Sequence, residues 1–321
     1  MLFAALTALR RSLYRIGILR THAMPVPVVV VGNLIAGGAG KTPVVMALVE
    51  TLRGRGYKPG VVSRGYGAET AGVLEVTRAT RAVECGDEPL LVHLRTGAPV
   101  VVGRDRVAAA RHLMRRHPTV DVLISDDGLQ HLRLARDAQV LVFDERGVGN
   151  GWLLPAGPLR ESLPRVVPPR SLVVYNSTAA STPLHGTLAR RSLSGAAALA
   201  DWWQGHPATR DALDSLRGRP LLAAAGVARP ERFFTMLRER GLAITALPLP
   251  DHDAYVTLPW PADAADVIVT EKDAIKLDAA RMGRTRVWVA PLDFALDAAF
   301  DAALLELLPP PGTPPHGNAT A

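Results

Sequence analysis

A glycine-rich stretch near the N-terminus, GNLIAGGAGKTP at residues 32–43, combines residue types that together bind phosphate groups. It follows the apolar run PVPVVVV and precedes a helical pattern, so its glycines allow the backbone to curl between a strand and a helix. Successive N–H groups would then point inward at the positive end of the helix and form a nest for phosphate oxygens. Lys41 would reach the terminal phosphates, and the Thr42 hydroxyl would bind Mg²⁺.

This strand–loop–GKT–helix arrangement is that of a P-loop, with one departure from the strict pattern. That pattern has glycine five residues before Gly40, where this chain has Ile35. The alternative is a glycine-rich turn that only starts a helix, and the context of the motif favours the P-loop. We expect a nucleotide, ATP or GTP, to be bound by Ala36, Gly37, Gly38, Ala39, Gly40, Lys41, Thr42 and Pro43.

Two adjacent carboxylates, Asp126 and Asp127, follow a second apolar strand in VDVLISDDGLQH. A P-loop site needs a metal carboxylate at the end of a neighbouring strand. Adjacent carboxylates also repel each other unless a cation lies beside them. The alternative is a simple Asp-Gly turn, but with the P-loop present we expect Mg²⁺ to be held by Thr42, Asp126 and Asp127.

Other polar residues could serve the group that accepts the phosphoryl. Asp87 in CGDEP is a candidate base, although it could also cap a helix beginning at Glu88. His252 in PDHDAY lies in a polar loop, where a turn or cap is an equally natural role. Arg64 and Tyr66 in SRGYG follow a strand end, where ligands of such sheets bind. The residues alone indicate a P-loop phosphotransferase or NTPase.

Short β-branched runs alternate with helical patterns along the chain, which predicts a mostly parallel, doubly wound α/β sheet of the P-loop NTPase kind. A second alternating series predicts a smaller α/β domain. The expected strands are 26–32, 59–65, 98–103, 120–125 and 138–144, then 171–176, 220–227, 266–273 and 286–294. The expected helices include 42–56, 105–117 and 230–241.

The proline-rich stretch 154–170 predicts a connection between the two domains. We therefore expect an amphipathic helix at 1–24, a P-loop domain at 25–165, a smaller α/β domain at 166–308 and a disordered tail at 309–321.

Charge and cysteine usage narrow the partners. The 321 residues carry a net charge of +7, nearly all from arginine, which suits an anionic substrate or membrane surface. No helix-turn-helix or zinc-finger signature is present, so we expect no nucleic-acid partner.

Cys85 is the single cysteine and cannot form an internal disulfide, which favours a reducing cytoplasm. There are only four lysines, so Lys41 and Lys272 mark positions where a compact ammonium is needed.

The N-terminal segment has apolar residues at helical spacing, interrupted by arginines too often for a membrane span. A secretory signal would place its positive charge before the apolar region, and here it follows. Two interpretations stay open: a helix packed on the domain, or a helix in the membrane interface whose arginines meet anionic lipid headgroups. The apolar positions are Leu2, Leu6, Leu9, Leu13 and Ile16, and the basic ones are Arg10, Arg11, Arg15 and Arg20.

Seven stretches in order, from about residue 30 to residue 277, resemble the tetraacyldisaccharide 4′-kinases of lipid A biosynthesis. They are VGNLIAGGAGKTP, VVSRGYG, GDEP, SDDGLQH, GWLLPAGPLRE, PDHDAY and VTEKDAIKL. The resemblance implies transfer of the ATP γ-phosphoryl, with Mg²⁺, to the 4′-hydroxyl of a lipid-linked glucosamine disaccharide 1-phosphate. It also implies peripheral attachment to the cytoplasmic face of the bacterial inner membrane, which favours the membrane interpretation of the first helix. We expect a monomer.

The resemblance also implies roles for individual residues. Asp87 would be the catalytic base, His252 would pair with it and orient it, and Lys41 would act on the phosphates. The ATP or substrate site would be lined by Asn33, Arg64, Tyr66, Gln130, His131, Arg160 and Glu161. From the residues alone, Arg106 in GRDR could neutralise phosphate or could be a solvated charge.

Two other functions stay open on the residues. The first is a P-loop GTPase or metal-chaperone NTPase, because TEKD is similar to the guanine-reading [NT]KxD pattern. The residue before Lys272 is Glu271, however, and Thr270 stands one place too early. The second is a nucleotide-dependent scaffold on the membrane, which would hydrolyse nucleotide slowly and form no phosphorylated lipid.

Overall fold

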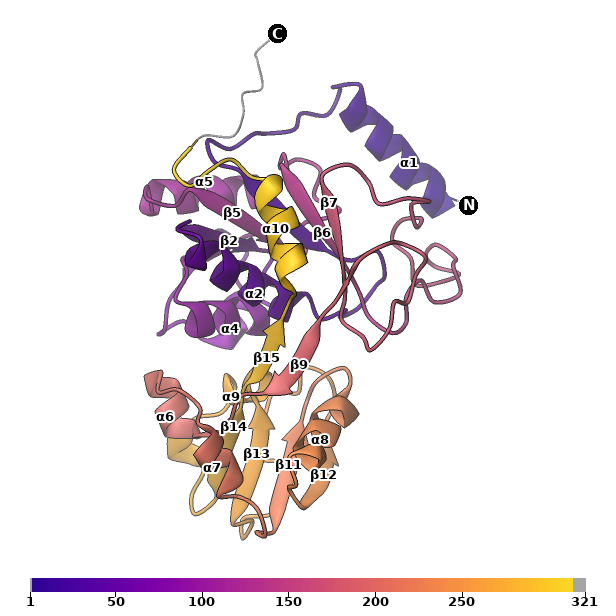
Figure 1. Cartoon of the computed structure of the whole chain (residues 1–321). Coiled ribbons are helices and arrows are strands. Elements are labelled where there is room, and N and C mark those ends of the chain that lie inside the picture. The colour runs from indigo at the N-terminus through magenta and orange to yellow at the C-terminus, as the bar shows by residue number, and fades with distance from the viewer. Residues whose placement is uncertain (1, 314–321) are drawn as a thin grey trace. The chain divides into compact units, whose positions relative to one another are not determined.

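The computed structural model describes residues 2–313, and the chain divides into two compact units (Figure 1). Unit 1 comprises Met1–Arg190 and Ala295–Ala321, and unit 2 comprises Arg191–Phe294. Strands β9 (Arg190–Leu193) and β15 (Leu292–Ala295), at the two crossings between the units, pair as a two-stranded sheet.

Unit 1 is built on an eight-stranded sheet in the order β3-β4-β2-β5-β1-β6-β7-β8. All neighbouring strands run parallel except β3, which is antiparallel to β4. The central strands are continuous runs of buried β-branched residues, as expected of a parallel sheet covered on both faces. The bounds are β1 (Val28–Gly32), β2 (Pro59–Ser63), β3 (Leu74–Val76), β4 (Val100–Val102), β5 (Val122–Asp126), β6 (Ala138–Phe143), β7 (Ser171–Tyr175) and β8 (Thr187–Leu188).

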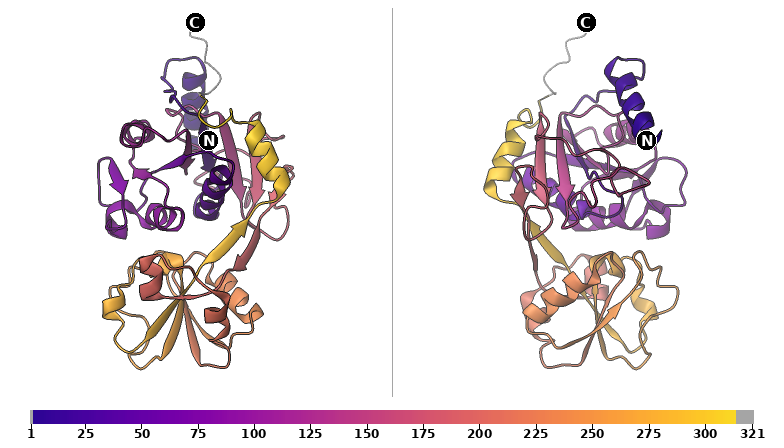
Figure 2. Two further views of the ribbon diagram at one scale, coloured as in Figure 1. Left: turned by 60° about the vertical axis from the view of Figure 1, so that its left-hand side comes forward. Right: turned by 90° about the vertical axis from the view of Figure 1, so that its right-hand side faces the viewer.

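Helices cover this sheet. Helix α2 packs on β1, β2 and β5, α5 packs on β2 and β4, and α10 lies against β7 (Figure 2). The predicted doubly wound α/β fold is therefore present, with the glycine-rich loop between β1 and α2. The bounds are α1 (Leu2–Arg15), α2 (Lys41–Gly54), α3 (Ala82–Cys85), α4 (Asp87–Thr96), α5 (Arg106–Arg116) and α10 (Ala298–Glu306).

The units do not follow the boundaries expected at 165 and 308. Strand β7 pairs with β6 in the sheet of unit 1. The proline-rich stretch is a loop inside unit 1 that returns to the glycine-rich loop: Ala36 donates its N–H to the Pro158 carbonyl, and Arg160 donates to that of Leu34, both at 2.7 Å. At the second expected boundary, Pro309 belongs to unit 1, and its carbonyl accepts a hydrogen bond from the Tyr57 hydroxyl at 2.7 Å.

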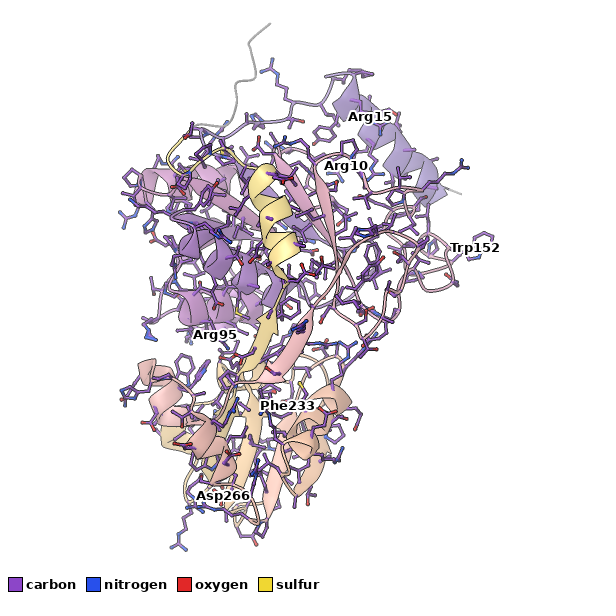
Figure 3. All side chains as sticks on the ribbon, in the orientation of Figure 1. Arg10, Arg15, Arg95, Trp152, Phe233 and Asp266 are labelled. Atoms are coloured by element: carbon purple, nitrogen blue, oxygen red, sulfur yellow. The ribbon has the colours of Figure 1, made fainter. Side chains whose placement is uncertain are left out.

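Unit 2 is the smaller α/β body that the sequence predicts. Its five strands are ordered β10-β14-β13-β11-β12, and all pairs are parallel except β10 with β14. Phe233 of α8 is labelled in Figure 3 and lies in the buried core of this unit. The bounds are β10 (Ala197–Ala198), α6 (Leu199–Gln204), α7 (Arg210–Asp214), β11 (Leu221–Ala225), α8 (Pro230–Glu239), β12 (Ile244–Pro248), β13 (Asp266–Thr270), α9 (Glu271–Ala274), the 3-10 helix η1 (Ala279–Arg281) and β14 (Arg286–Ala290).

Helix α1 turns part of its apolar stripe outward. Leu6 and Leu9 are each 55% exposed, and Ile16, directly after the helix, is 67% exposed, whereas Phe3, Arg11 and Leu13 are half-buried. In the described part of the chain, no helix has both the length and the apolar character needed to cross a membrane. Most of the tail expected at 309–321, residues 314–321, lies outside the described residues.

Candidate active site

The glycine-rich loop curls as the sequence predicts and ends at the N-terminus of α2. Gly37 and Gly40 have φ of 87° and 76°, in the left-handed region that favours glycine, and Gly40 is the N-cap of the helix. No side chain caps this helix end, so its first amides are available to an anion. Lys41 and Thr42, the first two helical residues, are both buried. The local geometry is thus that of a phosphate nest.

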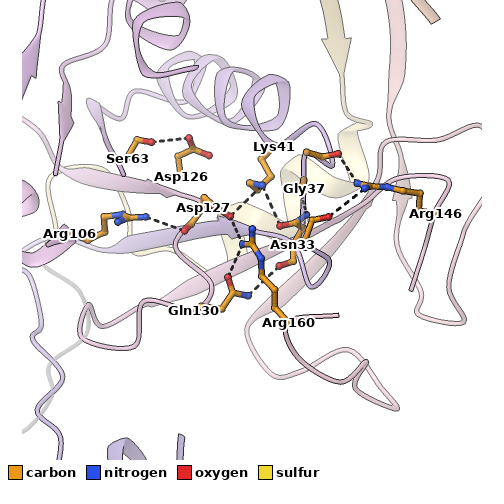
Figure 4. Close-up of polar contacts among 12 residues, drawn as sticks. Asn33, Gly37, Lys41, Ser63, Arg106, Asp126, Asp127, Gln130, Arg146 and Arg160 are labelled. Atoms are coloured by element: carbon orange, nitrogen blue, oxygen red, sulfur yellow. Dashed lines mark hydrogen bonds and ion pairs between the residues drawn. The ribbon is translucent and has the colours of Figure 1, made fainter. Parts of the chain in front are cut away.

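The ammonium of Lys41 is held beside this nest. Its Nζ lies 3.3 Å from Asn33 Oδ1 and 3.3 Å from Asp127 Oδ1 (Figure 4). A buried ammonium is stable only when paired, and Asp127 supplies the opposite charge. The lysine is therefore fixed at the loop, where it can meet the negative charge of a phosphate.

Asp127 is the centre of a wider polar network. Arg160 Nη1 lies 3.5 Å from Asp127 Oδ1 and 3.3 Å from Gln130 Oε1, while Gln130 Nε2 donates to the Asn33 carbonyl at 3.3 Å. Burial would raise the pKa of Asp127, but the charges of Lys41 and Arg160 lower it overall. Asp127 therefore stays ionised. Its backbone, at φ 48°, is held by the buried guanidinium of Arg106, which donates to the Asp127 carbonyl.

Asp126 is suited to a metal ion. Its Oδ2 accepts from the Ser63 hydroxyl at 3.1 Å, while its Oδ1 is buried without a hydrogen-bond partner. Burial raises the pKa of Asp126 to about 7, and the neighbouring charge of Glu88 adds to the rise. A cation at Oδ1 would relieve both effects, so the residues fit Mg²⁺. Among residues 2–313 no three His, Cys, Asp or Glu side chains form a metal cluster, so such an ion would need oxygens from Thr42, phosphate or water.

Asp87 is the first residue of α4, after the N-cap Gly86, and no side chain caps this helix end. The alternative role of Asp87, as a cap of this helix, stays open. The charge of Glu88, the next residue, raises the pKa of Asp126, so the start of α4 lies near the Asp126 carboxylate. The SRGYG loop is adjacent, because a Cβ at Gly86 would lie only 2.7 Å from the Tyr66 carbonyl oxygen.

His252 belongs to unit 2, whereas the other predicted site residues belong to unit 1, so its pairing with Asp87 stays a prediction. Its backbone is left-handed, with φ of 62°. Lys272 Nζ lies 3.3 Å from His252 Nε2 and 3.6 Å from Asp251 Oδ1. Lys272, one of the four lysines of the chain, thus belongs to the surroundings of His252.

Two other predicted site residues lie in enclosed surroundings: Glu161 has a structural ion pair, and His131 has a ring nitrogen, Nε2, that is buried without a hydrogen-bond partner. The buried carboxylate of Glu161 is paired with Arg11 of α1, which joins the N-terminal helix to the segment that carries Arg160. Burial and the charge of Arg106 lower the pKa of His131 to about 4, so this imidazole is neutral at physiological pH.

Two residues that the sequence analysis did not select also contact the loop. Arg146 follows β6 and Asn176 follows β7, and both donate to carbonyls of residues 36–39. Their only sequence signal is position: Arg146 stands just past the predicted strand 138–144, and Asn176 is the last residue of the predicted strand 171–176, at the carboxyl ends where ligands of parallel sheets bind.

Comparison with known proteins identifies relatives along nearly the whole chain. The family model described as tetraacyldisaccharide-1-P 4′-kinase matches residues 1–309. The tetraacyldisaccharide 4′-kinase of Methylibium petroleiphilum is 58% identical over 314 residues, which cover 96% of this chain and 88% of that protein. The corresponding enzyme of Leptothrix cholodnii is 54% identical over 309 residues, covering 95% and 88%.

A solved structure has the same fold. The crystal structure of LpxK from Aquifex aeolicus in complex with ATP superposes with a TM-score of 0.78 at 26% sequence identity, and the match covers 96% of each chain.

Proposed function

Because the chain belongs to the tetraacyldisaccharide-1-P 4′-kinase family and is a lipid A 4′-kinase that binds ATP, we propose how its residues perform the transfer. In this proposal the γ-phosphoryl of Mg·ATP moves from the glycine-rich loop to the 4′-hydroxyl of a tetraacyldisaccharide 1-phosphate beside Asp87. The observation that carries it is the buried Lys41 ammonium, fixed between Asn33 and Asp127 at the mouth of a phosphate nest.

The loop and Lys41 position the triphosphate. The amides at the start of α2 donate hydrogen bonds to the phosphate oxygens, and Lys41 exchanges part of its contact with Asp127 for the γ-phosphate. Asp126 and Thr42 would hold Mg²⁺, which supplies charge neutralisation of the phosphates when bound. Arg160 and Arg106 keep Asp127 ionised and correctly placed.

Asp87 acts on the acceptor. Its carboxylate accepts the proton of the 4′-hydroxyl while the oxygen–phosphorus bond to the sugar forms and the bond from the γ-phosphorus to the bridging oxygen breaks, which releases ADP. His252 of unit 2 orients the Asp87 carboxylate. Arg64 and Tyr66, in the loop adjacent to α3, contact the disaccharide or its phosphate.

Label transfer tests this function. The purified chain is incubated with γ-labelled ATP and tetraacyldisaccharide 1-phosphate in mixed micelles, with and without Mg²⁺. We expect label on the lipid only when Mg²⁺ is present. Labelled inorganic phosphate without labelled lipid would instead support a scaffold or NTPase. Phosphate release from γ-labelled GTP in preference to ATP, again without labelled lipid, would favour the GTPase class.

Replacing Thr42 by alanine should raise the Mg²⁺ concentration needed for half-maximal activity at least about tenfold, since one ligand oxygen is lost. Thr42→Ser, which keeps the hydroxyl, is the matched control and should stay close to wild type. A magnesium titration at saturating ATP measures both. An unchanged magnesium requirement in Thr42→Ala would remove Thr42 from the metal site.

The outward stripe of α1 supports attachment to the cytoplasmic face of the inner membrane. Leu6 and Leu9 are exposed beside Arg10 and Arg15, which project from the same helix (Figure 3). Apolar side chains would enter the lipid interface while arginines meet anionic headgroups.

The double substitution Leu6→Asp/Leu9→Asp should therefore weaken binding to anionic vesicles at least about tenfold, because each buried leucine contributes about 1.5–3 kcal/mol. Vesicle co-sedimentation measures the change. Val83→Asp, at an exposed apolar position of α3, is the control. Equal sedimentation of both variants with wild type would exclude α1 as the anchor.

A further inference from the structure

Every carbonyl of the four-residue segment 36–39 is bound from outside the phosphate nest by a side chain. Arg146 Nη1 donates to the first carbonyl at 3.4 Å, and its Nη2 donates to the third at 2.7 Å. Asn33 Nδ2 donates to the second at 3.1 Å, and Asn176 Nδ2 donates to the fourth at 3.1 Å. Figure 4 shows Asn33 and Arg146 on the loop. The donors come from the ends of three adjacent strands, β1, β6 and β7.

These bonds control the direction of the amides. In a planar peptide group the C=O and the N–H point in opposite directions. A carbonyl held outward therefore turns the following N–H inward, toward a bound phosphate. The segment contains two glycines, whose backbone freedom would otherwise have to be lost when a ligand binds.

From this arrangement we propose that Arg146 and Asn176 are positioning residues that hold the phosphate-binding loop in the shape that receives ATP. The inference rests on the proposed function in one respect, namely that this loop binds the triphosphate. It adds Arg146 and Asn176 to the residues on which ATP binding depends, and both act through the loop backbone.

Arg146 is itself rigidly held. Its Nε lies 3.1 and 3.0 Å from the two carboxylate oxygens of Asp144, and its Nη2 lies 2.9 Å from Oδ2. Asp144 is buried at the end of β6. This paired geometry needs the planar fork of a guanidinium, because a lysine ammonium cannot hold the carboxylate and two carbonyls at once.

The side chain of Asn176 is also fixed in position, by close packing. It is buried directly after β7, and a Cβ at Gly40 would collide with its side-chain amide. The amide of Asn176 therefore packs against the last turn of the loop while it binds the Ala39 carbonyl. This contact also explains why the position before Lys41 is glycine.

The dissociation constant of a fluorescent ATP analogue, measured on the full chain with Mg²⁺, tests the proposal. We expect Arg146→Ala to weaken binding about 10- to 100-fold and Asn176→Ala about 2- to 10-fold, the usual effects of losing charged and neutral hydrogen bonds. Arg146→Lys should bind the analogue almost as weakly as Arg146→Ala, although the lysine keeps the positive charge. Arg115→Ala, at an exposed position of α5, is the charge-matched control and should bind like wild type.

Steady-state kinetics and melting curves without nucleotide separate positioning from a general effect on folding. The KM for ATP should rise in the Arg146 and Asn176 variants while the KM for the lipid stays unchanged. Wild-type affinity in both Arg146→Ala and Asn176→Ala would overturn the proposal. Wild-type affinity in Arg146→Lys would overturn it too, because Arg146 would then act only as a distant charge. Failure of the wild-type chain to bind the analogue would instead refute the proposed function.

Discussion

Asp87→Asn is expected to lower kcat by roughly two to four orders of magnitude, the usual contribution of a general base. A sugar hydroxyl is a weak nucleophile, and an amide in place of the carboxylate cannot accept its proton. Asparagine keeps the shape of the side chain and is itself accepted at the start of a helix, so the substitution changes the charge of Asp87 with little change in packing. Single-turnover label transfer at saturating ATP measures the chemical step.

The control for this prediction is Glu84→Gln, which removes a carboxylate from the preceding helix α3. It should leave turnover close to wild type. ATP affinity should change little in Asp87→Asn, because the assigned role concerns the acceptor. Wild-type turnover in Asp87→Asn would assign the proton transfer to another group.

Lys41→Ala should lower kcat by roughly 10²–10³-fold, as the loss of one preorganised charge at the transition state does. The ammonium is buried between Asn33 and Asp127, so no water molecule takes its place with the same geometry. Lys41→Arg is not expected to restore activity, because the buried pocket fits a compact ammonium and not a planar fork.

Lys58→Ala provides the matched control for Lys41, since it removes an exposed lysine from the same unit. Steady-state assays at saturating ATP and lipid compare the two variants. Similar activity in the two would mean that total charge, and not the Lys41 position, matters for transfer.

The sequence predicts the parts of this site that depend on short-range pattern. The apolar run, the glycines and the GKT triplet are contiguous, so the loop and α2 follow from local chemistry. Asp126 and Asp127 follow in the same way, because they end a strand that lies next to β1 in the sheet. The place of the proline-rich segment 154–170 could not be predicted in this way. Its composition indicates a linker, whereas its backbone hydrogen bonds to residues 34–36 join positions far apart in the sequence.

Long-range contacts also explain why the sequence motifs did not identify two of the residues at the loop. Arg146 and Asn176 become partners of the loop only because β6 and β7 lie beside β1 in the sheet. Their own sequence surroundings contain no motif. The direction of α1 is a similar case, since spacing predicts an apolar stripe but not which face packs on unit 1.

A structure of the chain with Mg²⁺ and a non-hydrolysable ATP analogue tests the central claim most directly. We predict that the β- and γ-phosphates lie within hydrogen-bond distance of the amides at residues 38–42 and of Lys41 Nζ, with the Asp87 carboxylate facing the γ-phosphate. An analogue bound elsewhere with the loop empty, or an Asp87 carboxylate turned away from the γ-phosphate, would contradict the account.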